Sequence, residues 1–229
     1  MKKALIAILL LAVSIHTAVA SGGRESIHDS AEQAQPLMAG MMAPSFEVRT
    51  AADEPFAFDP LAMEKPVVLT FFRGGWCPYC NLHLSELRKA EASLKKMGFD
   101  VWFISIDKPG VLQESLDTPD IGYTLFSDSK LEATRAFGLA FRVDDATNER
   151  YLGFGIDLEA ASGENHHVLP VPATFIIGTD GVISFAYANP KYVTRLHPDV
   201  LLAAAGALQQ EADARLARMR KAQQQQEKK

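Results

Sequence analysis

The residues best suited to chemistry are the only two cysteines of the chain, Cys77 and Cys80, which form a C-x-x-C motif. They stand between an apolar, β-favouring run over residues 67–72 and a segment with helical periodicity that reaches about residue 97. Two thiols at this spacing can close a disulfide within one helical turn. The motif therefore predicts reversible thiol–disulfide chemistry.

The two cysteines are expected to have different roles. The thiolate is the nucleophile, and a cysteine at a helix N-terminus has a lowered pKa. We therefore expect Cys77 to be the exposed, low-pKa nucleophile and Cys80, one turn deeper, to resolve the mixed disulfide. Trp76 is expected to shield the sulfurs from water. Arg73 could add positive charge near the thiolate, but we expect it mainly as a solvated loop residue.

Two structural explanations of the motif are weaker. A disulfide across a C-x-x-C loop encloses too few residues to restrain much of the unfolded chain. A structural zinc site needs four ligands, and the sequence has no second C-x-x-C. Redox chemistry is therefore the favoured interpretation.

The pattern around the motif indicates alternating strands and helices. Residues 67–72 and 101–106 are expected as buried central strands, and residues 43–48 as an edge strand. Apolar positions three and four residues apart predict a helix from the motif to Met97, ended by Gly98. Further helices are expected at 111–116, at 130–137 and from residue 198. Further strands are expected at 123–126 and in a hairpin of 173–177 with 182–187. Residues 138–168 are expected to be loop.

The ends of the chain differ in composition from its middle. Residues 1–20 have two lysines, an apolar core and a small-residue cleavage site, which predicts a signal peptide and export to the periplasm without stable membrane insertion afterwards. Residues 21–42 are expected as a flexible leader, 43–207 as one domain and 208–229 as a polar helical tail. We expect this tail to be a solvated helix end, with a partner-docking helix as the alternative. The net charge of −5 argues against nucleic acid as a partner.

Three stretches together resemble a known family. They are Phe-Phe-Arg-Gly-Gly-Trp-Cys-Pro-Tyr-Cys over 71–80, Leu-Pro-Val-Pro-Ala-Thr over 169–174 and Ala-Asn-Pro-x-Tyr over 188–192. The combination resembles the thioredoxin superfamily, and within it the peroxiredoxin-like branch of the alkyl hydroperoxide reductase/thiol-specific antioxidant (redoxin) family.

This resemblance implies an α/β, thioredoxin-like fold with a central mixed β-sheet flanked by helices, here with a C-terminal helical extension. It also implies that Pro172 is a cis-proline beside the sulfurs. The backbone of Val171 would then be free to pair with an extended substrate. Val171 and Pro172, together with Trp76, are therefore expected to be substrate-positioning residues.

The resemblance leaves two reactions open. Peroxiredoxins carry Pro-x-x-x-Thr-x-x-Cys and a distant arginine. Without gaps, Cys80 falls at the peroxidatic cysteine, Cys77 at the threonine and Arg73 at the proline, while the arginine position falls near Pro172. All three accessory positions differ. We therefore expect a dithiol–disulfide oxidoreductase, with a thiol-dependent peroxidase as the alternative.

The partners expected follow from these two reactions. They are a disulfide-bearing protein or small molecule, or a hydroperoxide, together with a thiol donor. No cofactor is expected beyond the redox-active Cys77–Cys80 disulfide.

A third, minor alternative is a copper-binding thioredoxin-fold chaperone. It would use the two thiolates with an imidazole from His166 or His167, because soft thiolates and imidazole suit copper. Three other histidines, His28 of the leader and His83 and His197 of the domain, are expected at the surface.

Overall fold

A seven-stranded mixed sheet forms the centre of the molecule in the computed structural model, which describes residues 23–116 and 124–226. The expected signal peptide, 1–20, lies outside the described residues. The strand order is β2-β1-β5-β4-β3-β8-β9. The strands are β1 (Phe46–Thr50), β2 (Pro55–Phe58), β3 (Val67–Phe71), β4 (Asp100–Ser105), β5 (Thr124–Ser127), β8 (Ala173–Ile177) and β9 (Ile183–Ala188). Strands β3, β4 and β5 are parallel to one another, and the other pairs are antiparallel.

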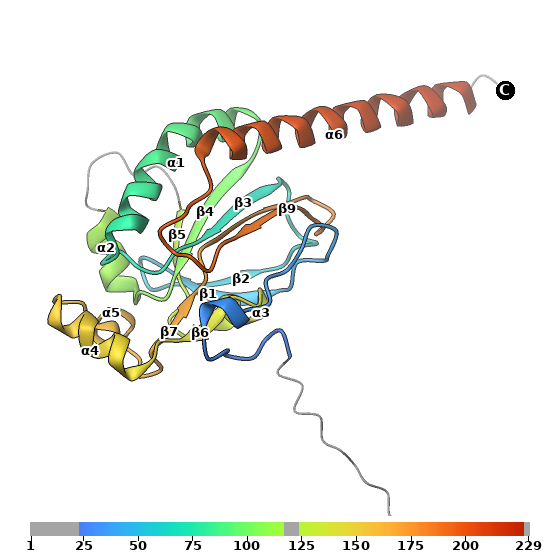
Figure 1. Ribbon diagram of the computed structural model, residues 1–229. Helices are drawn as coiled ribbons and strands as arrows, with labels where there is room; N and C mark the ends of the chain where they lie inside the picture. The colour runs from blue at the N-terminus through green and yellow to red at the C-terminus, as the bar shows by residue number, and fades with distance from the viewer. Residues whose placement is uncertain (1–22, 117–123, 227–229) are drawn as a thin grey trace, which may run out of the picture.

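Helices cover both faces of this sheet (Figure 1). Helices α1 (Pro78–Lys96) and α6 (Pro198–Gln226) pack on one face, and α3 (Glu132–Ala136) lies on the other. Helix α2 (Pro109–Leu116) follows β4. The run over β3 is apolar on both sides because alternate residues meet different layers. Val67, Leu69 and Phe71 join the core on the α3 side, and Val68 and Phe72 join the core under α1.

The unit β3-α1-β4 forms where the sequence predicts it, with bounds that differ by about one residue, and it places the motif. The apolar stripe of α1 (Leu84, Leu87, Ala90, Leu94) is buried against the sheet. The helix stops at Gly98, whose φ of +91° is the left-handed conformation that glycine adopts without a steric penalty. Because β3 ends where α1 begins, the cysteines lie at the carboxyl end of the central parallel strands.

The leader and the first strand differ from expectation. Residues 23–42 are packed onto the domain: they include a 3-10 helix, η1 (Ala31–Gln33), and a buried Leu37. The backbone N–H of Gln35 donates to the carbonyl of Gly138 at 3.0 Å. Strand β1 is not the edge of the sheet, because the unpredicted β2 covers it. The leader lacks periodicity since it is held by such backbone bonds to distant segments.

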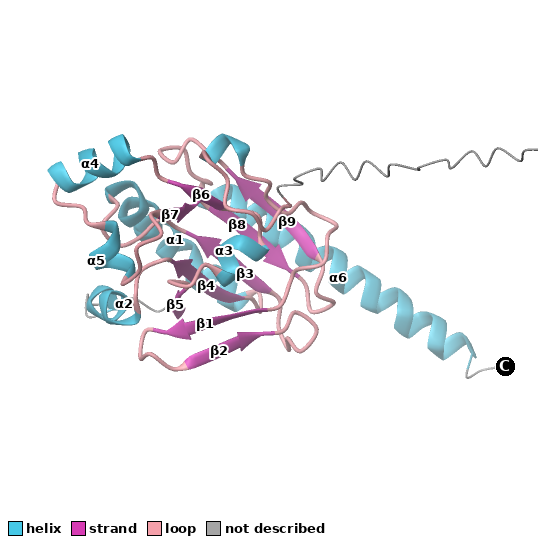
Figure 2. Cartoon of the chain, turned by 90° about the horizontal axis from the view of Figure 1, so that it is seen from below, coloured by secondary structure: helices cyan, strands magenta, loops and turns pink. Residues whose placement is uncertain are grey.

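The segment expected as loop, 138–168, contains regular elements (Figure 2). These are β6 (Ala140–Arg142), α4 (Asp145–Gly153), α5 (Leu158–Ser162) and β7 (Val168–Pro170). Strands β6 and β7 form a separate two-stranded antiparallel sheet. Asp144 and Asp157 cap the two helices by accepting from backbone N–H groups. The expectation was wrong because these elements are too short to show a clear period.

Helix α6 continues well beyond the domain (Figure 1). Leu201 and Ala205 are buried against the core, whereas residues 211–226 are exposed. No helix in the described ranges has the length and apolarity that crossing a bilayer requires.

Candidate active site

The two thiols occupy the start of α1. Cys77 is the residue before the first helical position, Pro78 is at that position, and Cys80 lies in the first turn. Both cysteines are free thiols. They are 1% and 0% exposed, because both side chains join the apolar cluster between α1 and the sheet. The expectation that Cys77 is exposed is therefore wrong.

The two thiols differ in acidity. The pKa of Cys77 is lowered to about 6, first because the Cys80 thiol donates a hydrogen bond to its sulfur. The charge of Arg73 and the backbone N–H of Cys80 lower it further, and burial opposes them. The pKa of Cys80 is raised, first because its thiol donates a hydrogen bond to the Cys77 sulfur and must keep its hydrogen to do so. Burial raises it further, because it disfavours the charged form. Cys77 is thus the stronger acid of the pair.

Arg73 is part of the site rather than a solvated residue. It is only 3% exposed, and its Nη1 lies 3.9 Å from the Cys77 sulfur. The guanidinium lies over the rings of Trp76 at 5.1 Å, Tyr151 at 5.5 Å and Tyr192 at 4.1 Å, and it donates to the Tyr151 hydroxyl. These aromatic faces stabilise the buried cation. They leave its positive charge directed at Cys77.

A buried carboxyl group holds the loop that precedes the motif. Oδ2 of Asp107 accepts from the backbone N–H of Gly75 at 2.7 Å and from the Ser105 hydroxyl at 3.0 Å. Burial raises the pKa of Asp107 to about 6. A Cβ on Gly74, whose φ is +154°, would lie 2.3 Å from Nε1 of Trp76 and 2.8 Å from Oδ1 of Asp107. Because Trp76 and Asp107 both approach position 74 this closely, only glycine fits there.

A distant segment supplies a second arginine. Nη2 of Arg195 lies 3.3 Å from the Cys80 sulfur. His83, on α1, is 5% exposed, and its Nε2 contacts the carbonyl oxygen of Leu196 at 3.0 Å. Burial and the charge of Arg195 lower the pKa of His83 to about 4. The expectation that His83 lies at the surface is wrong, because α1 and the segment before α6 enclose it.

The expected cis-proline is absent. No peptide bond in the described residues is cis, so the Val171–Pro172 bond is trans. The backbone N–H of Val171 donates to the carbonyl of Leu139 at 2.9 Å, and the carbonyl of Pro172 accepts from Asn189 at 3.1 Å. The Val171 N–H is therefore not free for an extended substrate. The pairing of β6 with β7 continues to Val171 and occupies it.

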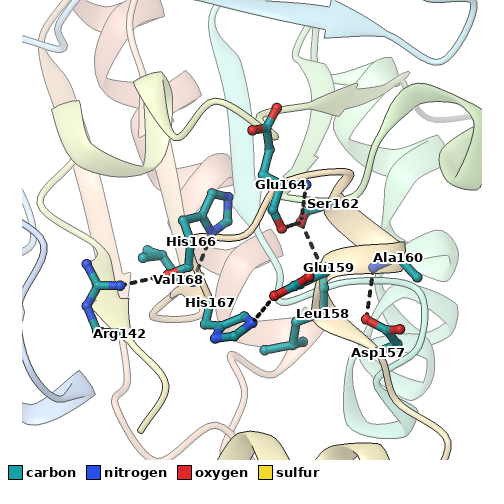
Figure 3. Close-up of polar contacts among 10 residues, drawn as sticks. All are labelled: Arg142, Asp157, Leu158, Glu159, Ala160, Ser162, Glu164, His166, His167 and Val168. Carbon is teal, nitrogen blue, oxygen red and sulfur yellow. Dashed lines mark hydrogen bonds and ion pairs between the residues drawn. The ribbon is translucent and has the colours of Figure 1, made fainter. Parts of the chain in front are cut away.

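The paired histidines make hydrogen-bond contacts with several segments, and Figure 3 shows those with Val168 and Glu159. Nε2 of His166 contacts the carbonyl of Ser129 at 3.1 Å, and its Nδ1 accepts from Val168 at 2.9 Å. His167 contacts Glu159 at 2.8 Å. Within the described residues, no three His, Cys, Asp or Glu side chains gather closely enough to hold a metal ion. The donor set of the copper alternative is thus not assembled.

Sequence reasoning named Arg73 only as a possible source of charge and missed several other residues of the site. Asp107 directly follows a buried strand, which is a weak signal that could have suggested it. Tyr192 ends the Ala-Asn-Pro-x-Tyr stretch, which was read only as a mark of the family, whereas Tyr151 and Arg195 stand in segments without any such signal.

Comparisons with known proteins show which family the chain belongs to. The AhpC/TSA family matches residues 39–186. Peroxiredoxin Bcp of Escherichia coli (strain K12) is 31% identical over 167 residues, which cover 73% of this chain and 94% of the relative. A putative peroxiredoxin bcp of Haemophilus influenzae is 26% identical over 45% of this chain and 66% of the relative.

Solved structures show the same fold. Peroxidoxin BcpB from Mycobacterium tuberculosis has a TM-score of 0.59 at 20% identity, covering 75% of this chain and 97% of that one. A mutant of peroxiredoxin 6 of Arenicola marina has a TM-score of 0.61 at 21% identity, covering 77% and 75%. The expected mixed sheet with flanking helices is confirmed. The chain therefore belongs to the AhpC/TSA family, as its sequence motifs predict.

Proposed function

We propose that the protein is a thiol-dependent peroxidase that reduces hydroperoxides through Cys77 and Cys80. Membership of the AhpC/TSA family and the similarity to peroxiredoxins support an oxidoreductase that acts through cysteine. The observation that carries the proposal is the pairing of a low-pKa Cys77 with the buried Arg73, whose Nη1 is 3.9 Å from the sulfur. This pairing supplies a thiolate and a fixed cation at one point.

The proposed reaction takes place in two steps. The Cys77 thiolate attacks one peroxide oxygen, the O–O bond breaks, and the leaving alkoxide or hydroxide takes a proton. Cys77 is then a sulfenic acid. Cys80 attacks its sulfur, the S–O bond breaks, and water leaves with the hydrogen of the Cys80 thiol. An external thiol donor reduces the Cys77–Cys80 disulfide.

The sequence alone favours a protein disulfide as the substrate. Two observations of the structure favour a peroxide instead. Cys77 is 1% exposed, so a small substrate needs less opening of the site than a polypeptide does. The Val171 N–H is already paired with Leu139 and offers no donor to a substrate backbone. Disulfide reduction is the second candidate, because the Cys77–Cys80 pair can perform it as well.

The test is the reaction of fully reduced protein with hydrogen peroxide in a stopped-flow instrument, followed by tryptophan fluorescence. Oxidation far faster than that of free cysteine at the same pH supports the proposal. Cys77→Ser should abolish it, and Cys80→Ser should stop at a sulfenic acid that dimedone traps. Oxidation no faster than free cysteine, with rapid reaction against an oxidised protein, would establish disulfide reduction instead. If only Cys80→Ser abolishes the reaction, Cys80 is the attacking residue.

We also propose that the enzyme acts in the periplasm. The basic start, apolar core and small-residue site within residues 1–20 support this. N-terminal sequencing of the protein from a periplasmic fraction should begin at Ser21. Recovery with Met1 intact in the cytoplasmic fraction would contradict it.

A further inference from the structure

Each sulfur of the pair has its own guanidinium. Nη1 of Arg73 lies 3.9 Å from the Cys77 sulfur, whereas Nη2 of Arg195 lies 3.3 Å from the Cys80 sulfur. Arg195 comes from the connection between β9 and α6, 115 residues away from Cys80 in sequence. Its Nε and Nη1 are buried and have no hydrogen-bond partner within the part of the chain that the structure describes. The contact with Cys80 is thus the polar contact that the structure gives to this side chain.

Contacts on both sides hold this connection across the start of α1. On one side, the carbonyl of Leu196 meets Nε2 of His83 at 3.0 Å. A carbonyl oxygen only accepts, so Nε2 of His83 must carry the hydrogen. On the other side, Tyr192 lies over Arg73 and packs edge-on against Tyr79 at 5.7 Å. Arg195 lies between these two contacts and is therefore fixed beside Cys80.

We propose that Arg195 is the catalytic residue of the second step, in which Cys80 closes the disulfide, and that His83 is the positioning residue that keeps it there. The assignment rests on the proposed function only in naming a peroxide as the oxidant of the first step. Any reagent that leaves the Cys77 sulfur bonded to a leaving group is followed by the same second step, the attack of Cys80 on that sulfur.

The order of the two steps follows from the contacts. In the reduced site, Cys80 donates its hydrogen to the Cys77 thiolate, and the neighbouring negative charge further opposes ionisation of Cys80. Both effects vanish once the Cys77 sulfur is bonded to oxygen or to another sulfur. The charge of Arg195, which favours the Cys80 thiolate, remains. Cys80 thus becomes a nucleophile only after Cys77 has reacted.

The test uses reduced full-length protein and dithiodipyridine, a neutral disulfide. The Cys77 thiolate attacks it, its S–S bond breaks, and one thiopyridone leaves. The Cys80 thiolate then attacks the mixed disulfide and expels the second thiopyridone, and the proton of Cys80 goes to solvent. Absorbance resolves the two releases as two phases, so each step is measured separately. A neutral probe avoids a direct attraction to either arginine.

Arg195→Met should slow the second phase by about tenfold or more, since one pKa unit on Cys80 changes its thiolate fraction by about tenfold. The first phase should change by less than about threefold, because Arg195 is the weakest contributor to the pKa of Cys77. Arg195→Lys, which keeps the charge, should recover part of the second phase. Arg218→Met, the same change on the exposed part of α6, is the matched control.

His83→Leu should slow the second phase in the same way, and His83→Gln, which keeps a donor for the Leu196 carbonyl, should restore it. An unchanged second phase in Arg195→Met would overturn the proposal. If Arg195→Met does not fold, the comparison of Arg195→Lys with Arg195→Gln tests the proposal, because only the lysine keeps the charge. Equal rates of the second phase in these two variants would also overturn the proposal. If hydrogen peroxide oxidises the wild-type protein no faster than free cysteine, the peroxidase function is refuted. The two phases of thiopyridone release would still test the role of Arg195.

Discussion

Replacement of Arg73 by methionine tests the electrostatic basis of the site. Methionine keeps an apolar side chain of similar length against the three rings but removes the charge from its place near the Cys77 sulfur. Two unit charges about 4 Å apart interact by about 4 kcal/mol at an effective dielectric constant of about 20, which is an upper limit for a delocalised guanidinium. Arg73 is one of several contributors, after the Cys80 hydrogen bond.

The pKa of Cys77 falls from 9.0 to about 6 in the folded protein. We expect loss of Arg73 to return one to two of these units, or roughly 1.4 to 2.7 kcal/mol. At pH 6 the wild-type thiolate fraction is about one half, and in Arg73→Met it should be roughly a tenth or less. At pH 9 the two proteins should be similar.

The assay is the rate of Cys77 alkylation by iodoacetamide from pH 4 to pH 10, with the alkylated residue identified by peptide mass spectrometry. The midpoint should lie near pH 6 in the wild type and in the control Arg218→Met, and near pH 7 to 8 in Arg73→Met, an upward shift of roughly one to two units. Thermal unfolding verifies that each variant is folded. An unchanged midpoint in folded Arg73→Met would refute the claim that Arg73 sets the ionisation of Cys77.

Three further predictions concern the stability of the fold. Gly74→Ala should destabilise the protein by roughly 1–3 kcal/mol in urea unfolding, because the added methyl group meets Trp76 and Asp107; an unaffected midpoint would contradict this. Burial raises the pKa of Asp128 to about 7, so its contribution to stability is full below pH 4 and is lost as the pH rises through 7. Wild type should therefore lose stability relative to Asp128→Asn between pH 4 and 8, and parallel pH profiles would count against it. Deletion of 211–229 should shift the melting temperature by less than about 4 °C, since 211–226 are exposed; a larger loss would show that the tail packs on the domain.

The local pattern of the sequence predicts much of the fold. The apolar runs at β3 and β4, the stripe of α1 and the hairpin of β8 with β9 are each specified by neighbouring residues, so periodicity suffices to find them. The C-x-x-C motif likewise places two thiols at a helix start and makes the first the more acidic. These features depend on short separations along the chain.

Other features depend on residues that are far apart in sequence. Arg195 reaches Cys80 from 115 positions away, and Tyr151 reaches Arg73 from 78 positions away. An arginine in a polar loop looks solvated until a distant segment covers it, which is why Arg73 was expected in solvent. The Val171 N–H was expected to be free because only the tertiary structure pairs it with Leu139. Residue type and local spacing thus identify the atoms that can react, whereas the packing of distant segments sets the charge beside each sulfur, because charges act through space and not along the chain.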